Sequence, residues 1–68
     1  MRTNLKVFRI QRKMTQKEFA KVIGCSLSQY GMIEQGQREG KQTFWNNLQT
    51  NFNIPDGQMW ELMKLDKA

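Results

Sequence analysis

The sequence predicts a small all-α domain built from five short helices. Apolar residues recur at helical spacing, as in Phe44, Leu48 and Phe52, and no stretch alternates in the manner of a β-strand. Residues that start and end helices lie between these apolar stretches. The length of 68 residues is near the lower limit for a core without disulfides or metal ions. We therefore expect residues 1–68 to form one compact domain.

The first two helices are expected at about residues 4–13 and from Thr15 onward. Thr15 and Glu18 form a T-x-x-E capping box, in which the hydroxyl accepts from the backbone N–H of Glu18 and the carboxylate accepts from that of Thr15. Gly24 ends the second helix. The residues expected on the buried faces of these two helices are Leu5, Phe8, Phe19, Ala20 and Ile23.

Residues 16–35 indicate two helices joined by a tight turn. Ala20 is small enough for the helices to cross closely, and Gly24 adopts the turn conformation that other residues avoid. Tyr30 and Ile33 are then the apolar residues that pack the second helix against the core. This layout is that of a helix-turn-helix motif.

Further signals place the remaining helices. Ser26 is a favourable N-cap for a helix at about 27–35, and Gly36 ends it. A polar loop leads to a fourth helix at about 41–52, and a fifth begins at Pro55.

The composition argues against an enzyme, a metalloprotein and a membrane protein. Cys25 is the only cysteine and there is no histidine, so we expect no disulfide, no metal site and no base-activated nucleophile. No apolar run is long enough for a signal peptide or a membrane span. We expect a cytoplasmic protein without metal or cofactor, in which Cys25 is inert packing.

The positive charge is concentrated at the start of the chain. The formal net charge is +5, and residues 1–21 carry seven of the eleven basic residues with only one acidic residue, Glu18. A basic half on a small domain suits a polyanionic partner such as DNA. Charge alone is equally compatible with an ordinary solvated surface.

The pattern as a whole resembles the DNA-binding domain of the phage Cro and lambda-type repressor family of helix-turn-helix regulators. The resemblance extends from about Leu5 to Met63, and its strength lies in the combination of residues rather than in any single one. The matching residues are Leu5, Phe8, Arg9, Thr15, Gln16, Phe19, Ala20, Ile23, Gly24, Ser26, Ile33, Glu34, Gly36, Leu48, Phe52 and Ile54.

The resemblance implies roles for three of these polar residues. Gln16, at the start of the second helix, corresponds to a glutamine that contacts a DNA phosphate in the family, and the free N–H groups of that helix end also favour an anion. The alternative is an exposed residue without a partner. Arg9 and Glu34 correspond to an ion pair between the first and third helices, in which Arg9 orients Glu34 rather than touching DNA.

The third helix is expected to read base edges in the major groove through Leu27, Ser28, Gln29 and Met32. Gln29 can pair with adenine through two hydrogen bonds, and the apolar residues can contact a thymine methyl. Many family members have a serine-arginine step where this sequence has Gly31 and Met32, so this helix lacks one arginine that could contact a base or a phosphate. Tyr30 is expected in the core with its hydroxyl reaching solvent, or in contact with a phosphate.

Contacts to the DNA backbone are expected from Gln37, Arg38 and Lys41 in the loop after the third helix, together with Gln16 and Lys17. Each loop charge could instead be a solvated surface group. The basic cluster beside this surface, which contains Arg12, Lys13, Lys17 and Lys21, cannot all touch one duplex and is assigned mainly to long-range attraction.

A domain of this size has a small footprint, so a homodimer on two half-sites is expected. The candidate dimer interface consists of Ile54, Met59, Trp60 and Met63. Trp60 could instead close the core of a single protomer.

Two classes of function follow. The first is a sequence-specific transcriptional regulator, by resemblance a repressor of phage, plasmid or mobile-element type that binds a palindromic operator on double-stranded DNA as a dimer. The second is an antitoxin-like or adaptor module on the same fold, whose main partner is another protein and for which DNA binding is secondary.

Overall fold

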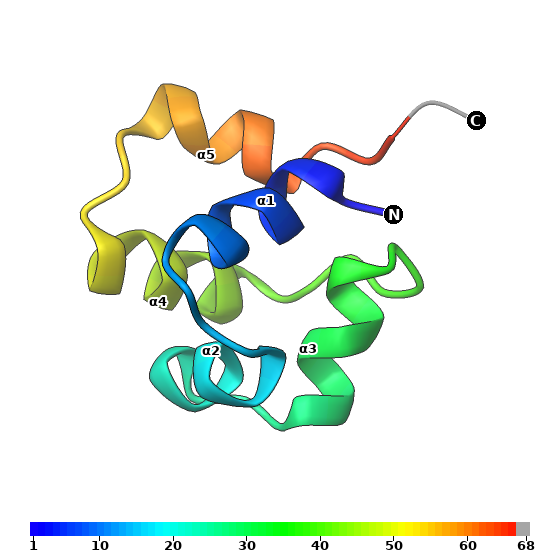
Figure 1. Cartoon of the computed structure of the whole chain (residues 1–68). Helices are drawn as coiled ribbons and strands as arrows, with labels where there is room; N and C mark the ends of the chain where they lie inside the picture. The colour runs from blue at the N-terminus through cyan, green and yellow to red at the C-terminus, as the bar shows by residue number, and fades with distance from the viewer. Residues whose placement is uncertain (67–68) are drawn as a thin grey trace.

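A computed structural model describes residues 1–66, which contain helices and connecting segments but no strand. The expected all-α fold is therefore confirmed. In Figure 1, α2 and α5 lie at opposite ends of the molecule, with α1 between them and α3 along one side. The helices are α1 (Thr3–Gln11), α2 (Gln16–Ile23), α3 (Leu27–Glu34), α4 (Gln42–Phe52) and α5 (Asp56–Met63).

The helix ends are formed by the expected capping residues. The Thr15 hydroxyl accepts from the Glu18 backbone N–H at 3.1 Å, and the Glu18 carboxylate accepts from the Thr15 N–H at 3.0 Å, so the capping box is confirmed. Gly24 closes α2 with φ of 90°. The first helix ends at Gln11 rather than at Lys13, because Lys13 takes a left-handed conformation with φ of 56°.

Aromatic rings form the centre of the core. Phe8 meets Phe19 edge-on, with ring centroids 6.2 Å apart, and Phe19 stacks on Phe52 at 5.0 Å. These rings join α1, α2 and α4. The buried apolar residues are Leu5, Phe8, Phe19, Ala20, Ile23, Tyr30, Ile33, Phe44, Trp45, Leu48, Ile54, Met59 and Leu62.

Tyr30 is more deeply buried than its sequence position indicates. Its side chain is 0% exposed, and its hydroxyl has no hydrogen-bond partner among the described residues. The expectation that this hydroxyl reaches solvent or a phosphate is therefore wrong, because α3 packs the ring against Phe19 in the core. Burial, together with the nearby Glu34 carboxylate, raises the pKa of Tyr30 far above its ordinary value.

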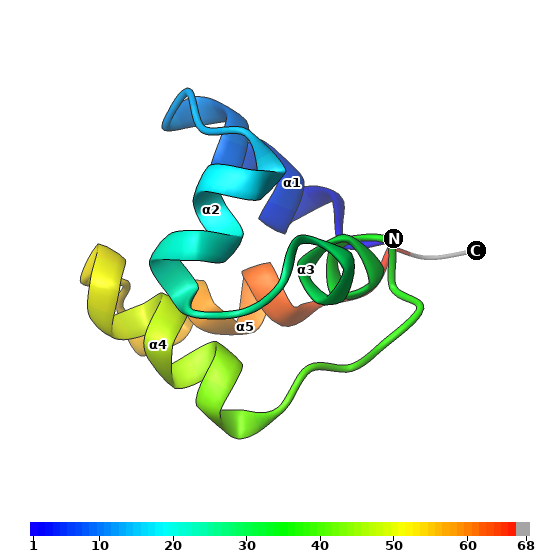
Figure 2. The same cartoon turned by 90° about the horizontal axis from the view of Figure 1, so that it is seen from below.

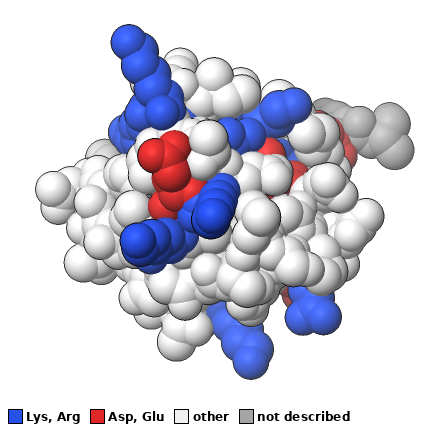
Figure 3. All heavy atoms as spheres, turned by 60° about the horizontal axis from the view of Figure 1, so that its bottom comes forward, with Lys and Arg blue, Asp and Glu red and all other residues white. Residues whose placement is uncertain are grey.

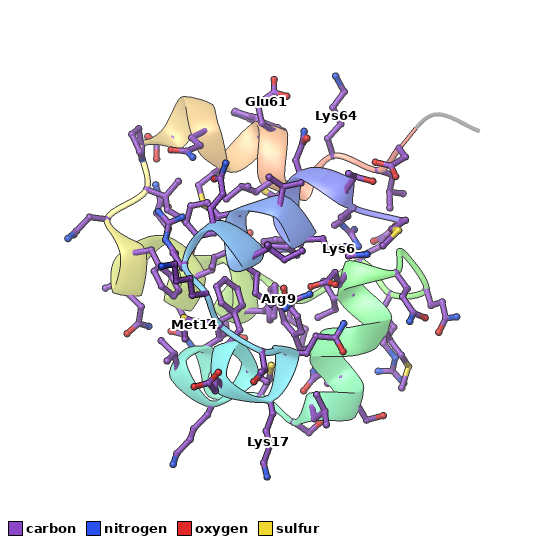
Figure 4. All side chains as sticks on the ribbon, in the orientation of Figure 1. Lys6, Arg9, Met14, Lys17, Glu61 and Lys64 are labelled. Carbon is purple, nitrogen blue, oxygen red and sulfur yellow. The ribbon has the colours of Figure 1, made fainter. Side chains whose placement is uncertain are left out.

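The Glu34 carboxylate is the polar centre of the helix junction. Arg9 Nε donates to its Oε2 at 3.0 Å, and Gln16 Nε2 donates to its Oε1 at 3.1 Å, so the pair implied by the resemblance is present. The Glu34 side chain is 2% exposed and that of Arg9 11%. Burial alone would raise the pKa of Glu34, but hydrogen bonds from its neighbours, Arg9 first, hold it below its ordinary value. Arg9 lies between α1, α2 and α3 in Figure 4.

We expect Arg9→Ala to lower the free energy of unfolding by about 3–5 kcal/mol, because the buried Glu34 carboxylate would keep its charge without its cationic partner. Chemical denaturation measures this loss, with Lys21→Ala as the exposed control, which should stay within about 0.5 kcal/mol of the wild type. A loss below about 1 kcal/mol for Arg9→Ala would show that water compensates for the pair.

We expect Tyr30→Phe to leave the free energy of unfolding unchanged or to raise it. The substitution removes a buried hydroxyl that makes no hydrogen bond and keeps the ring that packs against Phe19. Thermal and chemical unfolding of the two proteins test this directly. A loss of more than about 1 kcal/mol would show that the hydroxyl has a hydrogen-bond partner in solution.

Candidate nucleic-acid interface

The outer side of α3 presents the residues that were expected to read bases. Tyr30, Ile33 and Glu34 form the buried side of this helix. Leu27 is 48% exposed and Ser28 is exposed as well. The half-buried pair on the same helix is Gln29 and Met32.

The start of α3 is held firmly while its outer side stays open. The Ser26 hydroxyl accepts from the Gln29 backbone N–H at 3.0 Å, which fixes the first turn. A Cβ atom built on Gly31 would meet nothing within 4 Å, so packing within the protein does not require glycine at this position. α2 and α3 lie nearer the viewer than α5 in Figure 2, which looks at the molecule from below.

The segment after α3 lies beside this helix and carries exposed basic side chains. Gln37, Arg38 and Lys41 are all exposed. A surface hollow of about 360 Å³ is lined by Gln29 of α3 and by Arg38 and Lys41 of this segment. The remaining residues that line it are Ile33, Glu39 and Gly40.

Gln16 has a partner within the protein. Its half-buried side chain donates one amide proton to Glu34, so the alternative of an exposed residue without a partner is wrong. The amide thus belongs to the polar junction beneath α3, at the N-terminal end of α2. A phosphate at that end would meet both the amide and the free backbone N–H groups of the first turn.

The basic side chains form no continuous patch on the face seen in Figure 3, where they stand apart among uncharged atoms and an acidic group lies among them. Lys17 projects away from the body of the protein at the α2 end (Figure 4). Arg12, in contrast, folds over Phe8, with its guanidinium carbon 3.4 Å from the ring centroid and Nη1 donating to the Phe8 carbonyl at 3.2 Å. The four-residue spacing of Phe8 and Arg12 was the sequence signal for this contact.

Of the four residues in the candidate dimer interface, the structure leaves Trp60 and Met63 accessible to a second protomer. Ile54 and Met59 are 4% and 6% exposed and belong to the core, so they are not free to contact a second protomer. Trp60 is 74% exposed, and Met63 is half-buried beside it. Trp60 therefore does not close the core of its own protomer.

Within residues 1–66 no three side chains of the kinds that bind metals are grouped as a metal site, and no helix is long and apolar enough to cross a membrane. Cys25 is half-buried next to the core, and burial raises the pKa of its thiol. A thiol with a raised pKa carries less of the reactive thiolate.

Comparison with known proteins identifies the family of this domain. A family model described as helix-turn-helix matches residues 5–43, which include α2, α3 and the segment up to Lys41. No curated protein and no solved structure matches the chain. Domains of this family bind DNA and are typically not enzymes. The matched segment covers more than half of the sequence, and the chain belongs to the helix-turn-helix family of Cro/C1 type.

Proposed function

We propose that this protein is a sequence-specific transcriptional regulator in which α2 and α3 form the helix-turn-helix unit and α3 enters the major groove. The observation that carries this proposal is the shared surface of α3 and the segment after it. Leu27 and Ser28 are exposed on the helix. Gln29 of the same helix lines one hollow together with Arg38 and Lys41. Groups for base edges and groups for phosphates therefore occupy one side of the molecule.

The chemistry of α3 favours a site rich in A·T pairs. Gln29 offers the amide pair that recognises adenine, and Ser28 can donate or accept one hydrogen bond. Leu27 and Met32 suit the methyl group of thymine. No basic residue lies in α3, so the phosphate contacts come from neighbouring segments. The residues proposed for these contacts are Gln16, Lys17, Gln37, Arg38 and Lys41.

Selection of bound duplexes from a random pool at near-physiological salt tests this proposal. We expect enrichment of an A·T-rich palindrome whose half-sites are about 34–36 Å apart, one helical turn of DNA. A pool that stays random under these conditions would contradict sequence-specific recognition by this protein.

We expect Gln29→Ala to cost about 1–3 kcal/mol of binding free energy at one base position only, because it removes a contact to a base edge. Gln37→Ala is the matched control, a glutamine in the loop whose loss should weaken binding to every sequence to the same extent. Titrations against a set of single-base operator variants measure both effects. Uniform weakening by Gln29→Ala would make Gln29 a backbone contact.

A homodimer is the proposed binding unit, and Trp60 with Met63 is the proposed contact between protomers. The protomer measures 29 × 26 × 24 Å, less than the roughly 34–36 Å of one helical turn of DNA, so a second protomer is needed to occupy a second half-site. Trp60 lies on α5, at the opposite end of the molecule from α2 (Figure 1), so it stays uncovered while α3 faces DNA. A steric repressor of phage, plasmid or mobile-element type fits such a dimer.

We expect sedimentation at tens of micromolar to show a dimer for the wild type and a monomer for Trp60→Ala. Ile10→Ala is the matched control, because Ile10 is also a large exposed apolar residue, at 51%, but lies on α1. It should leave the dimer intact. A wild-type protein that stays monomeric, or an Ile10→Ala variant that alone dissociates, would contradict this interface.

The exposed Trp60 also supports the second candidate function, an antitoxin-like or adaptor module whose main partner is a protein. Ionic strength separates the two candidates. Affinity for DNA falls steeply as salt rises, because binding releases condensed counterions. Binding of an apolar partner to Trp60 would change little over the same range of salt.

A further inference from the structure

Arg2 is a buried arginine that takes no part in the proposed DNA contacts. It is 4% exposed, and it and Glu34 are the buried charged residues of the described chain. Unlike Arg9, it forms no ion pair in residues 1–66. Its guanidinium is instead bound by backbone carbonyls.

Four hydrogen bonds tie the Arg2 guanidinium to three segments. Nη1 donates to the Ile33 carbonyl near the end of α3 at 2.5 Å, and to the Arg38 carbonyl at 2.8 Å. Nη2 donates to the Glu39 carbonyl at 3.4 Å, and Nε donates to the Met63 carbonyl at the end of α5 at 2.9 Å. The carbonyl ends of helices carry partial negative charge, which suits a cation there.

The segment from residue 38 to 40 is held to α3 by one backbone hydrogen bond, from the Arg38 N–H to the Met32 carbonyl at 3.3 Å, and otherwise by side chains. Among the described residues, the Arg38 carbonyl accepts only from Arg2, and the Glu39 carbonyl accepts only from Arg2 and from Trp45 Nε1 at 3.1 Å. Gly40, with φ of 82°, lies against the Trp45 ring. The Arg2 guanidinium itself lies 5.4 Å from the centroid of that ring.

We propose that Arg2 is a positioning residue for DNA binding, which fixes the segment 36–41 so that Arg38 and Lys41 face the phosphates beside α3. This inference rests on the proposed function of that surface. Arg2 does not touch DNA in this arrangement, because its guanidinium is buried beneath the segment. Its effect is to order the loop before binding, so that binding does not have to order it.

The first experiment measures the loop in the free protein. NMR order parameters of residues 37–41 should be near 0.85 in the wild type and fall below about 0.6 in Arg2→Met, while the helices stay ordered. Leu62→Ala is the control, because it removes a buried α5 side chain that takes no part in these hydrogen bonds. It should lower stability but leave the segment ordered.

The second experiment measures binding to a random-sequence duplex over a range of salt. We expect the slope of log affinity against log salt to become shallower in Arg2→Met by about 0.9 for each phosphate that the loop no longer neutralises. Arg38→Ala should weaken wild-type binding, but adding it to Arg2→Met should change affinity by less than about twofold, because Arg38 no longer reaches a phosphate in that variant. Independent, additive losses would overturn the proposal.

Arg2→Lys provides a second variant if Arg2→Met does not fold. It keeps the positive charge but loses the planar fork of N–H groups that reaches several carbonyls at once. It should reduce the order of residues 37–41 and the salt slope in the same direction. Unchanged order and slope in the folded variant would overturn the proposal. A wild-type protein that does not bind duplex at all would overturn the proposed function instead.

Discussion

The arrangement of the first three helices depends on one buried carboxylate, that of Glu34. It lies on α3 and receives hydrogen bonds from Arg9 on α1 and from Gln16 on α2. A buried charge without partners is costly, so any motion that separates these helices is opposed at this point. The orientation of α3 relative to α1 and α2 is therefore set by this polar junction as well as by apolar packing.

A second arginine acts at the same C-terminal end of α3. Arg9 acts on the Glu34 side chain, whereas Arg2 acts on carbonyls at and after the end of the helix, and its backbone N–H also donates to the Glu34 carbonyl at 2.7 Å. The two contacts differ in kind, because one pairs opposite charges and the other satisfies carbonyls that the helix leaves unpaired. Together they hold α3 by its buried side and by its carbonyl end, while its outer side remains free.

The sequence predicted those features that local chemistry decides. The capping box of Thr15, the glycine at position 24 and the apolar spacing of α4 each depend on residues a few positions apart. The role of Arg2 was not predicted, because its four acceptors come from segments 31 to 61 residues away, and an arginine near a terminus looks like a solvated charge. Ile54, in the linker before α5, and Met59, on α5, were misplaced for a different reason, since the apolar pattern of a short segment does not tell which of its residues meet the core.

The two tryptophans lie in opposite environments, so the tryptophan fluorescence of the protein has one buried and one exposed source. Trp45 is 4% exposed and its indole N–H is bound to the Glu39 carbonyl, whereas Trp60 is 74% exposed. An indole in water emits at longer wavelength than one in a core, so the two emissions separate. The buried fluorophore therefore reports on the loop beside α3, and the exposed one on whatever covers α5, within a single unlabelled chain.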